Sequence, residues 1–170
     1  QVVLPKFDVD LALEAHRRRP VTFFVGVPPM FERIAKGALE TNTDISSIRF
    51  AVSGAMPLSE KVAHLWQSAS HGIILEGYGL SETSPVISGS PLSNNRRLGT
   101  LGLPFPSTQV RLVDLDDPGK DVKEGVRGEI LVKGPQVFSG YLNAPEETAR
   151  AFTEDGWFRT GDVAINDDGY

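Results

Sequence analysis

Three short segments of this sequence carry side chains that a nucleotide site needs. The first is Ser53-Gly54-Ala55-Met56-Pro57, which follows an apolar run ending at Val52. Its small residues let the main chain approach a flat ring closely, and Pro57 fixes the direction of the chain. An ordinary turn between a strand and a helix has the same composition, so both interpretations stay open for this segment alone.

The second segment is Glu76-Gly77-Tyr78-Gly79-Leu80-Ser81-Glu82-Thr83, directly after the apolar run that ends at Leu75. Two glycines free the backbone around Tyr78, whose ring can then lie against a base, a contact worth roughly 1 to 3 kcal/mol in nucleic-acid complexes. Ser81 offers a hydroxyl to a phosphate oxygen, and Glu82 offers a carboxylate to a magnesium ion that bridges phosphates. A glycine-rich turn with a surface tyrosine and a solvated glutamate is the alternative.

The third segment is Gly156-Trp157-Phe158-Arg159-Thr160-Gly161-Asp162. An aspartate held just past a glycine turn can accept both hydroxyls of a ribose, because its carboxylate has two oxygens. Aspartate is also common in β-turns for purely local reasons. Asp162 alone is therefore weak evidence for a nucleotide.

The elements that must position the first two segments form an alternating pattern over residues 1–95. We expect helices that begin near Asp8, Pro28 and Ser59, because each start has a capping residue or a proline before an apolar face. Strands are expected at 21–25, which should be buried, at 48–52 and at 73–75. This alternation predicts part of an α/β layer with mainly parallel strands, and ligands of such sheets bind at the carboxyl ends of strands.

Residues 96–170 have a different pattern, with short strands expected at 110–113, 129–132 and 162–165 and one short helix from Pro145. Gly, Pro and Asp clusters between the strands predict a small antiparallel β-barrel-like subdomain. The sequence stops just after Asn166-Asp167-Asp168-Gly169, a hairpin-turn signal whose second strand is missing. We therefore expect an internal piece of a longer protein, truncated within this β-rich subdomain.

Composition excludes several classes of protein. The 170 residues are 40% hydrophobic and 23% charged, which suits a globular core. A net charge of -5 and the lack of a long Lys/Arg block argue against a nucleic-acid partner. The absence of cysteine excludes disulfide scaffolds and thiolate metal sites and fits a reducing compartment. No apolar run approaches the ~20 residues of a membrane span, so we expect a cytoplasmic protein without a transmembrane segment, and peripheral contact with the inner membrane face stays open.

Taken together, the order and spacing of the three segments resemble the adenylate-forming superfamily, which includes acyl-CoA synthetases, luciferases and the adenylation domains of peptide synthetases. The large domain of that family carries a YGxTE-type loop and, about eighty residues later, TGD; Tyr78-Gly79-Leu80-Ser81-Glu82 and Thr160-Gly161-Asp162 stand in those places. Residues 128–134 and 140–143 are similar to the family's connecting segment. The resemblance covers essentially the whole chain as an internal fragment of the large N-terminal domain, and residues 7–31 and 88–108 look most like bacterial long-chain fatty-acid–CoA ligases.

The resemblance implies a reaction and its substrates. A fatty-acid carboxylate attacks the α-phosphate of ATP, with magnesium present, to give acyl-adenylate and pyrophosphate, and coenzyme A then displaces AMP to give a thioester. It also implies roles for individual residues of this sequence. Gly54, Ala55, Met56 and Pro57 are expected to contact one face of the adenine and Tyr78 the other, with further nucleotide contacts from Glu76, Gly77 and Gly79. Ser81 is expected to bind the α-phosphate, Glu82 magnesium and Asp162 the ribose. Three positions depart from the usual pattern: Ser81 replaces Thr, Met56 stands where Ala is common, and Glu76 where an amide is often seen.

The family's phosphate loop, hinge and catalytic lysine have no counterpart in this sequence, so we expect no catalytic residue within it and no measurable adenylation by these residues alone. Segments 21–27 and 86–88 resemble walls of the acyl channel, although a protein core needs the same apolar residues. Two alternatives remain: adenylation of another carboxylic acid, whether aryl, short-chain or amino acid, and a non-catalytic nucleotide-binding or structural module. The sequence does not indicate an oligomeric state.

Overall fold

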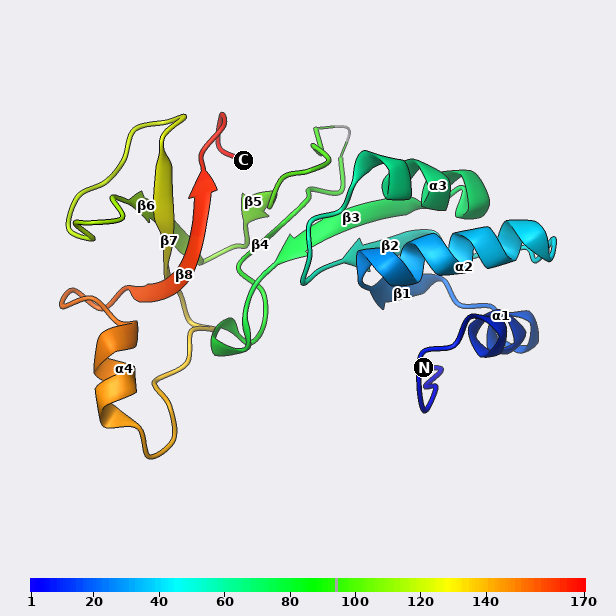
Figure 1. The fold of residues 1–170 in the computed structure, drawn as a ribbon, viewed down its shortest axis with the longest axis horizontal. Helices are drawn as coiled ribbons and strands as arrows, with labels where there is room; N and C mark the ends of the chain where they lie inside the picture. Colours follow the sequence, from blue (N-terminus) through cyan, green and yellow to red (C-terminus); the bar gives the residue numbers. More distant parts are fainter. Residues whose placement is uncertain (94) are drawn as a thin grey trace. The chain divides into compact units, whose positions relative to one another are not determined.

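The structure is a computed structural model that describes residues 1–93 and 95–170. These residues form two compact units. Unit 1 comprises Gln1–Gly77 and Ser90–Thr100, and unit 2 comprises Tyr78–Gly89 and Leu101–Tyr170. Figure 1 labels their helices and strands.

Unit 1 is an α/β layer built on three strands. Strands β1 (Phe23–Gly26), β2 (Phe50–Ser53) and β3 (Ile73–Tyr78, whose last residue belongs to unit 2) pair in parallel, with Phe23 opposite Phe50 and Phe50 opposite Ile73. Helices α1 (Val9–Arg18), α2 (Pro28–Glu40) and α3 (Glu60–Ser70) alternate with them along the chain. The predicted parallel α/β layer is confirmed.

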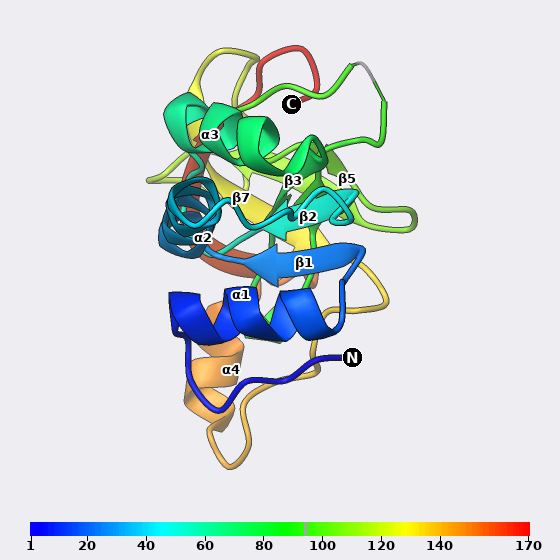
Figure 2. The ribbon, with the colours of Figure 1, turned by 90° about the vertical axis from the view of Figure 1, so that its right-hand side faces the viewer.

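Local signals explain where the three helices begin. Asp8 Oδ1 accepts the backbone N–H of Leu11 at 3.0 Å, and Ser59 Oγ accepts that of Val62 at 3.3 Å, while α2 starts with a proline pair. Each cap satisfies a donor that the first helical turn leaves free. Helices α2 and α3 run side by side in Figure 1, and Phe31 and Trp66 from them meet edge to face with ring centroids 4.8 Å apart. Figure 2 shows α1 lying next to β1.

The expectation that the first strand is buried was wrong. Phe23 and Val25 are 55% and 61% exposed, whereas Phe24 between them packs on the core of unit 1. In the described residues β1 pairs only with β2 and has one covered face, so its side chains alternate between core and surface. An apolar run in sequence does not separate a strand covered on both faces from one covered on a single face.

Unit 2 is a β-rich unit. Strands β6 (Gln109–Val113), β7 (Arg127–Lys133) and β8 (Phe158–Ile165) form an antiparallel sheet in that order. The two short strands β4 (Ser88–Gly89) and β5 (Leu103–Pro104) also pair antiparallel with each other. Helix α4 (Pro145–Ala151) and the 3₁₀ helix η1 (Ser81–Thr83) complete the unit. The antiparallel prediction is confirmed, but the described strands form an open sheet rather than a barrel, because β6 and β8 each pair with β7 and not with each other.

None of the helices in residues 1–93 and 95–170 is long and apolar enough to span a bilayer. The longest, α2, has 13 residues, fewer than the ~20 that a membrane span requires.

Candidate nucleotide site

The loop Gly54–Pro57 lies at the carboxyl end of β2 in unit 1, as expected for a ligand-binding loop of a parallel sheet. Ala55, Met56 and Pro57 are exposed, and Ala55 has φ 64°, a left-handed conformation that is rare for alanine. A Cβ atom added to Gly54 would lie 3.5 Å from the carbonyl oxygen of Gly77, so this loop runs directly beside the end of β3. Strained, exposed backbone of this kind occurs often at binding sites.

Glu76 and Gly77 belong to β3 and not to a loop, because β3 extends as far as Tyr78 and pairs Glu76 with Ser53 of β2. The carboxylate of Glu76 is buried, accepting the backbone N–H of Gly99 at 2.7 Å and that of Leu58 at 3.3 Å. Burial raises the pKa of this carboxyl, although the backbone donors oppose the shift. Glu76 therefore ties two loops of unit 1 together, and its carboxylate faces protein donors.

Tyr78 and Asp162 meet in unit 2. The Tyr78 hydroxyl donates to Asp162 Oδ2 at 2.7 Å across 84 residues of sequence. Burial raises the pKa of Tyr78, and the neighbouring Asp162 carboxylate raises it further, so the phenol stays a donor at neutral pH. Asp162 itself is exposed, so its carboxylate is accessible to a ligand.

Asp162 lies inside β8 and not just past a turn, which corrects the expectation from sequence. The strand is irregular there: the β7–β8 register shifts between Glu129 and Leu131, and Gly161 has φ 74°. A β-bulge of this type turns side chains in a new direction. Glu129 stabilises it, because its buried carboxylate accepts two nitrogens of Arg159, the shorter contact being 2.7 Å, and the Gly161 N–H at 3.3 Å.

Ser81 and Glu82 lie on η1, which two contacts fix in unit 2. The buried Thr83 hydroxyl accepts the N–H of Leu80 at 3.0 Å and closes the turn, and the N–H of Phe138 donates to the Glu82 carbonyl oxygen at 2.8 Å. Ser81 is exposed. A Cβ atom on Gly79 would collide with the carbonyl oxygen of Pro85, so only glycine fits before this turn.

Glu82 has one carboxylate oxygen engaged. The hydroxyl of Tyr141 donates to Glu82 Oε1 at 2.9 Å, and this bond raises the pKa of Tyr141. The described residues contain no group of three His, Cys, Asp or Glu side chains that could hold a metal by themselves. Magnesium commonly takes one or two protein carboxylates and completes its shell with phosphates and water, and a single accessible Glu82 fits that requirement.

Sequence reasoning missed four residues that shape these positions: Thr83, Glu129, Tyr141 and Arg159. Their contacts join residues from 3 to 59 positions apart. Tyr141 lies in residues 140–143, which resemble the family's connecting segment, and its place beside Gly140 was the one signal in the sequence that could have pointed to a role for it.

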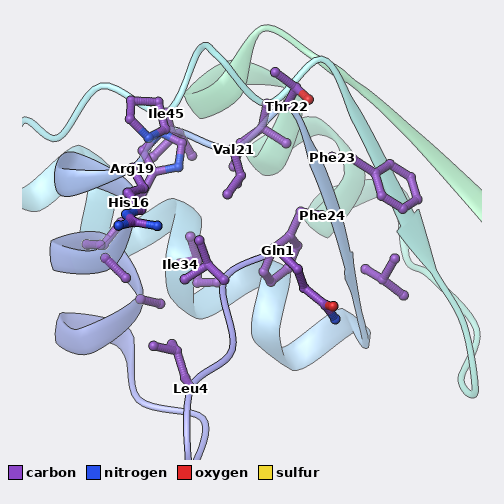
Figure 3. A pocket seen from close by; sticks show the side chains of 17 residues that line it. Gln1, Leu4, His16, Arg19, Val21, Thr22, Phe23, Phe24, Ile34 and Ile45 are labelled. Atoms are coloured by element: carbon purple, nitrogen blue, oxygen red, sulfur yellow. The ribbon is translucent and has the colours of Figure 1, made fainter.

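A cavity of about 820 Å³ lies elsewhere in unit 1, lined by residues of α1 and β1 and by the first residues of the chain. Figure 3 shows His16 and Arg19 near Ile45 in its wall, and Phe23 and Phe24 on opposite sides of β1. The predicted nucleotide-binding residues do not line this cavity. Residues 21–25, part of the segment predicted to form an acyl channel, do line it.

Solved structures with this fold define the class. The ATP-bound MatB from Rhodopseudomonas palustris is 35% identical, with a TM-score of 0.86 over 99% of this chain and 33% of that one. A malonyl-CoA ligase in a product complex with methylmalonyl-CoA and AMP is 36% identical, with a TM-score of 0.79 over 97% of this chain and 35% of its own. The fold is thus that of adenylate-forming enzymes.

The sequence gives the family directly: the profile described as AMP-binding enzyme matches residues 1–142, and the chain belongs to that family. Among curated relatives, a long-chain-fatty-acid–CoA ligase of Yersinia pestis is 42% identical over 164 residues, which are 96% of this chain and 29% of the relative. The chain therefore spans less than a third of the length of that relative.

Proposed function

We propose that the full-length protein containing this chain is an ATP-dependent long-chain fatty-acid–CoA ligase. In the first step a carboxylate oxygen of the fatty acid attacks the α-phosphorus of ATP, and pyrophosphate leaves with the bond electrons. In the second step the sulfur of coenzyme A attacks the acyl carbon, and AMP leaves as the thioester forms. The fatty-acid substrate is favoured by the relative from Yersinia pestis.

The observation that carries this proposal is the 2.7 Å hydrogen bond between Tyr78 and Asp162. It joins the two motifs that the resemblance assigns to adenine and to ribose, although 84 residues separate them. Since Oδ2 of Asp162 accepts the phenol O–H, we assign Oδ1 to the ribose hydroxyls, and the same hydrogen bond restrains the Tyr78 ring that we assign to stacking on the base.

The remaining roles are assigned residue by residue. In unit 1, the exposed loop from Gly54 to Pro57 contacts adenine, and Glu76 and Gly77 shape that contact through the main chain. In unit 2, Gly79 lets the chain turn into η1, where Ser81 donates to an α-phosphate oxygen. Glu82 would hold magnesium, which neutralises phosphate charge and orients the phosphates when bound.

This chain contains no residue that we assign to the chemical step, and by itself it is expected to be inactive. Charge stabilisation in adenylyl transfer needs positioned cations and phosphate-loop donors, and the family's phosphate loop and catalytic lysine have no counterpart in this sequence. We also propose that residues 1–95 and 96–170 belong to separate subdomains and that the protein works in the cytoplasm, with peripheral contact at the inner membrane face. Both statements remain predictions.

A panel of carboxylic acids tests the proposal. Full-length protein with ATP, magnesium and coenzyme A should release AMP with the highest kcat/KM for long-chain fatty acids. Matched Tyr78→Ala and Asp162→Ala variants should lower kcat/KM for ATP by at least about tenfold. Absence of AMP with every acid would refute the ligase assignment and favour a non-catalytic module.

Adenylation of a shorter or dicarboxylic acid is the second candidate, and the malonyl-CoA ligase at 36% identity favours it. Pocket shape decides such differences, and one methylene in an apolar pocket changes specificity only about 10- to 200-fold. The same panel separates the two: a preference for malonate or another short acid over palmitate would replace the fatty-acid assignment.

A further inference from the structure

The loop after β7 carries a tyrosine for which neither the motifs nor the proposed reaction gives a role. Tyr141 follows Gly140 and lies between β7 and α4, and its side chain is partly exposed. Its hydroxyl donates to Glu82 Oε1 at 2.9 Å, across 59 residues of sequence. The same loop also donates to the main chain of Glu82 through the N–H of Phe138, at 2.8 Å. Glu82 is therefore held by its side chain and its backbone from one loop.

The backbone of Tyr141 is fixed from the other side. Its N–H donates to Thr148 Oγ1 at 2.9 Å, and the Thr148 hydroxyl donates to the Ala144 carbonyl oxygen at 2.8 Å. Gly140 has φ 145°, and a Cβ atom there would lie 2.5 Å from Thr148 Cγ2. This close approach requires glycine before the tyrosine. The loop therefore reaches Glu82 from a fixed attachment on α4.

The ring of Tyr141 is fixed as well. It packs edge to face on Phe138 with centroids 4.8 Å apart, and Phe138 contacts the rings of Phe152 and Phe158 with centroids 5.7 Å and 5.5 Å away. Phe158 is buried at the start of β8. Aromatic pairs in this geometry add about 0.5 to 1.5 kcal/mol beyond the area they bury. The phenol is thus presented to Glu82 by a packed cluster and not by a freely rotating side chain.

We propose that Tyr141 is a positioning residue that orients the Glu82 carboxylate for a divalent cation bound with ATP, an inference that rests on the function proposed above. The hydroxyl occupies Oε1 and limits rotation of the carboxylate, so that Oε2, which accepts no hydrogen bond from the described residues, faces the cation. Holding an acceptor in advance lowers the ordering cost when the ligand arrives. The hydrogen bond is solvent-accessible, so its effect is modest.

Calorimetric titration of ATP into the full-length protein, without any carboxylic acid, tests this role in two conditions, excess magnesium and EDTA. Tyr141→Phe keeps the ring and its contact with Phe138 and removes only the hydroxyl. We expect it to weaken ATP binding about three- to tenfold with magnesium and to leave binding in EDTA unchanged. Tyr170→Phe, which removes the same atom from the turn at residues 167–170, is the matched control and should match wild type in both conditions.

A second variant separates this inference from the function on which it rests. Glu82→Gln should remove most of the magnesium enhancement, and Tyr141→Phe added to it should have no further effect. If Tyr141→Phe binds ATP as tightly as wild type in magnesium while Glu82→Gln binds it more weakly, the role of Tyr141 is overturned and the cation site at Glu82 is not. Equal weakening with and without magnesium would show that the hydroxyl supports the fold and would also overturn it. If wild type and Glu82→Gln bind ATP equally in both conditions, the cation site at Glu82 fails as well.

Discussion

The ion pair between Glu129 and Arg159 offers a quantitative test of how Asp162 is held in place. Replacing Arg159 with methionine keeps the length of the side chain and removes the charge. Among the described residues, the Gly161 N–H at 3.3 Å is then the one donor left to the buried Glu129 carboxylate. Breaking a fully buried pair costs about 3 to 5 kcal/mol, and an exposed pair contributes about 0 to 1 kcal/mol. Since the Glu129 side chain is 8% exposed and that of Arg159 is 38% exposed, we expect an intermediate loss of about 2 kcal/mol.

Urea denaturation of Arg159→Met, Glu129→Gln and the double variant measures this loss and the coupling between the two residues. Glu129→Gln leaves a guanidinium that water reaches, so it should cost only about 1 kcal/mol. The double variant should cost less than the sum of the single ones by about 1 kcal/mol or more, because each single change strands a partner. The KM for ATP should rise in Arg159→Met, because the bulge that orients Asp162 loosens.

Arg150→Met is the matched control for this cycle. Arg150 pairs with Glu146 and Glu147 at 4.0 Å and 3.6 Å on the exposed face of α4, with its side chain 71% exposed. Its loss should change stability by less than about 0.5 kcal/mol. The reasoning is refuted if Arg159→Met is as mild as Arg150→Met, or if the Glu129 and Arg159 effects simply add.

Three further predictions follow from individual side chains. Burial lowers the pKa of His16 in the folded protein, partly opposed by Asp44, so the unfolded chain binds a proton first as pH falls. The stability that depends on neutral His16 should be complete above about pH 6.5 and decline on acidification. His16→Gln should flatten this decline in urea midpoints measured between neutral and acidic pH. Gly79→Ala places a methyl group against the Pro85 carbonyl oxygen, so thermal unfolding should reveal a loss of at least about 2 kcal/mol, and a variant as stable as wild type would contradict the tight turn. Tyr78→Phe keeps the stacking ring and removes the bond to Asp162, so steady-state kinetics should show a KM for ATP raised about two- to tenfold, less than in Tyr78→Ala; equal effects would mean that the ring does not stack.

The order of elements was predictable because its signals are local. Asp8 and Ser59 cap helices whose apolar faces repeat with the helical period, and these signals act within a few residues. Strand limits and burial depend on neighbours distant in sequence. β3 includes Glu76 because that residue pairs with Ser53 of β2, and Phe23 is exposed because the described residues cover β1 on one face only.

For the candidate site, the resemblance supplied residue roles that spacing alone leaves open. It singled out Tyr78 and Asp162, which the structure joins by a hydrogen bond, while their roles toward a nucleotide remain predictions. The partners of these groups were not predictable. Nothing in the sequence near Glu82 indicates that a phenol 59 residues away will hold it, because that contact depends on how the loop after β7 folds.

The buried Glu76 has a consequence for recombining this segment with its relatives. Its two oxygens accept main-chain donors from Leu58 and Gly99, so the stretch before α3 and residues 97–100 share one acceptor. A chimera that imports an amide at position 76 but keeps Leu58 and Gly99 of this chain would place an NH₂ group opposite one of their two backbone N–H donors. Crossover points for such hybrids should therefore keep position 76 and residues 97–100 from the same parent.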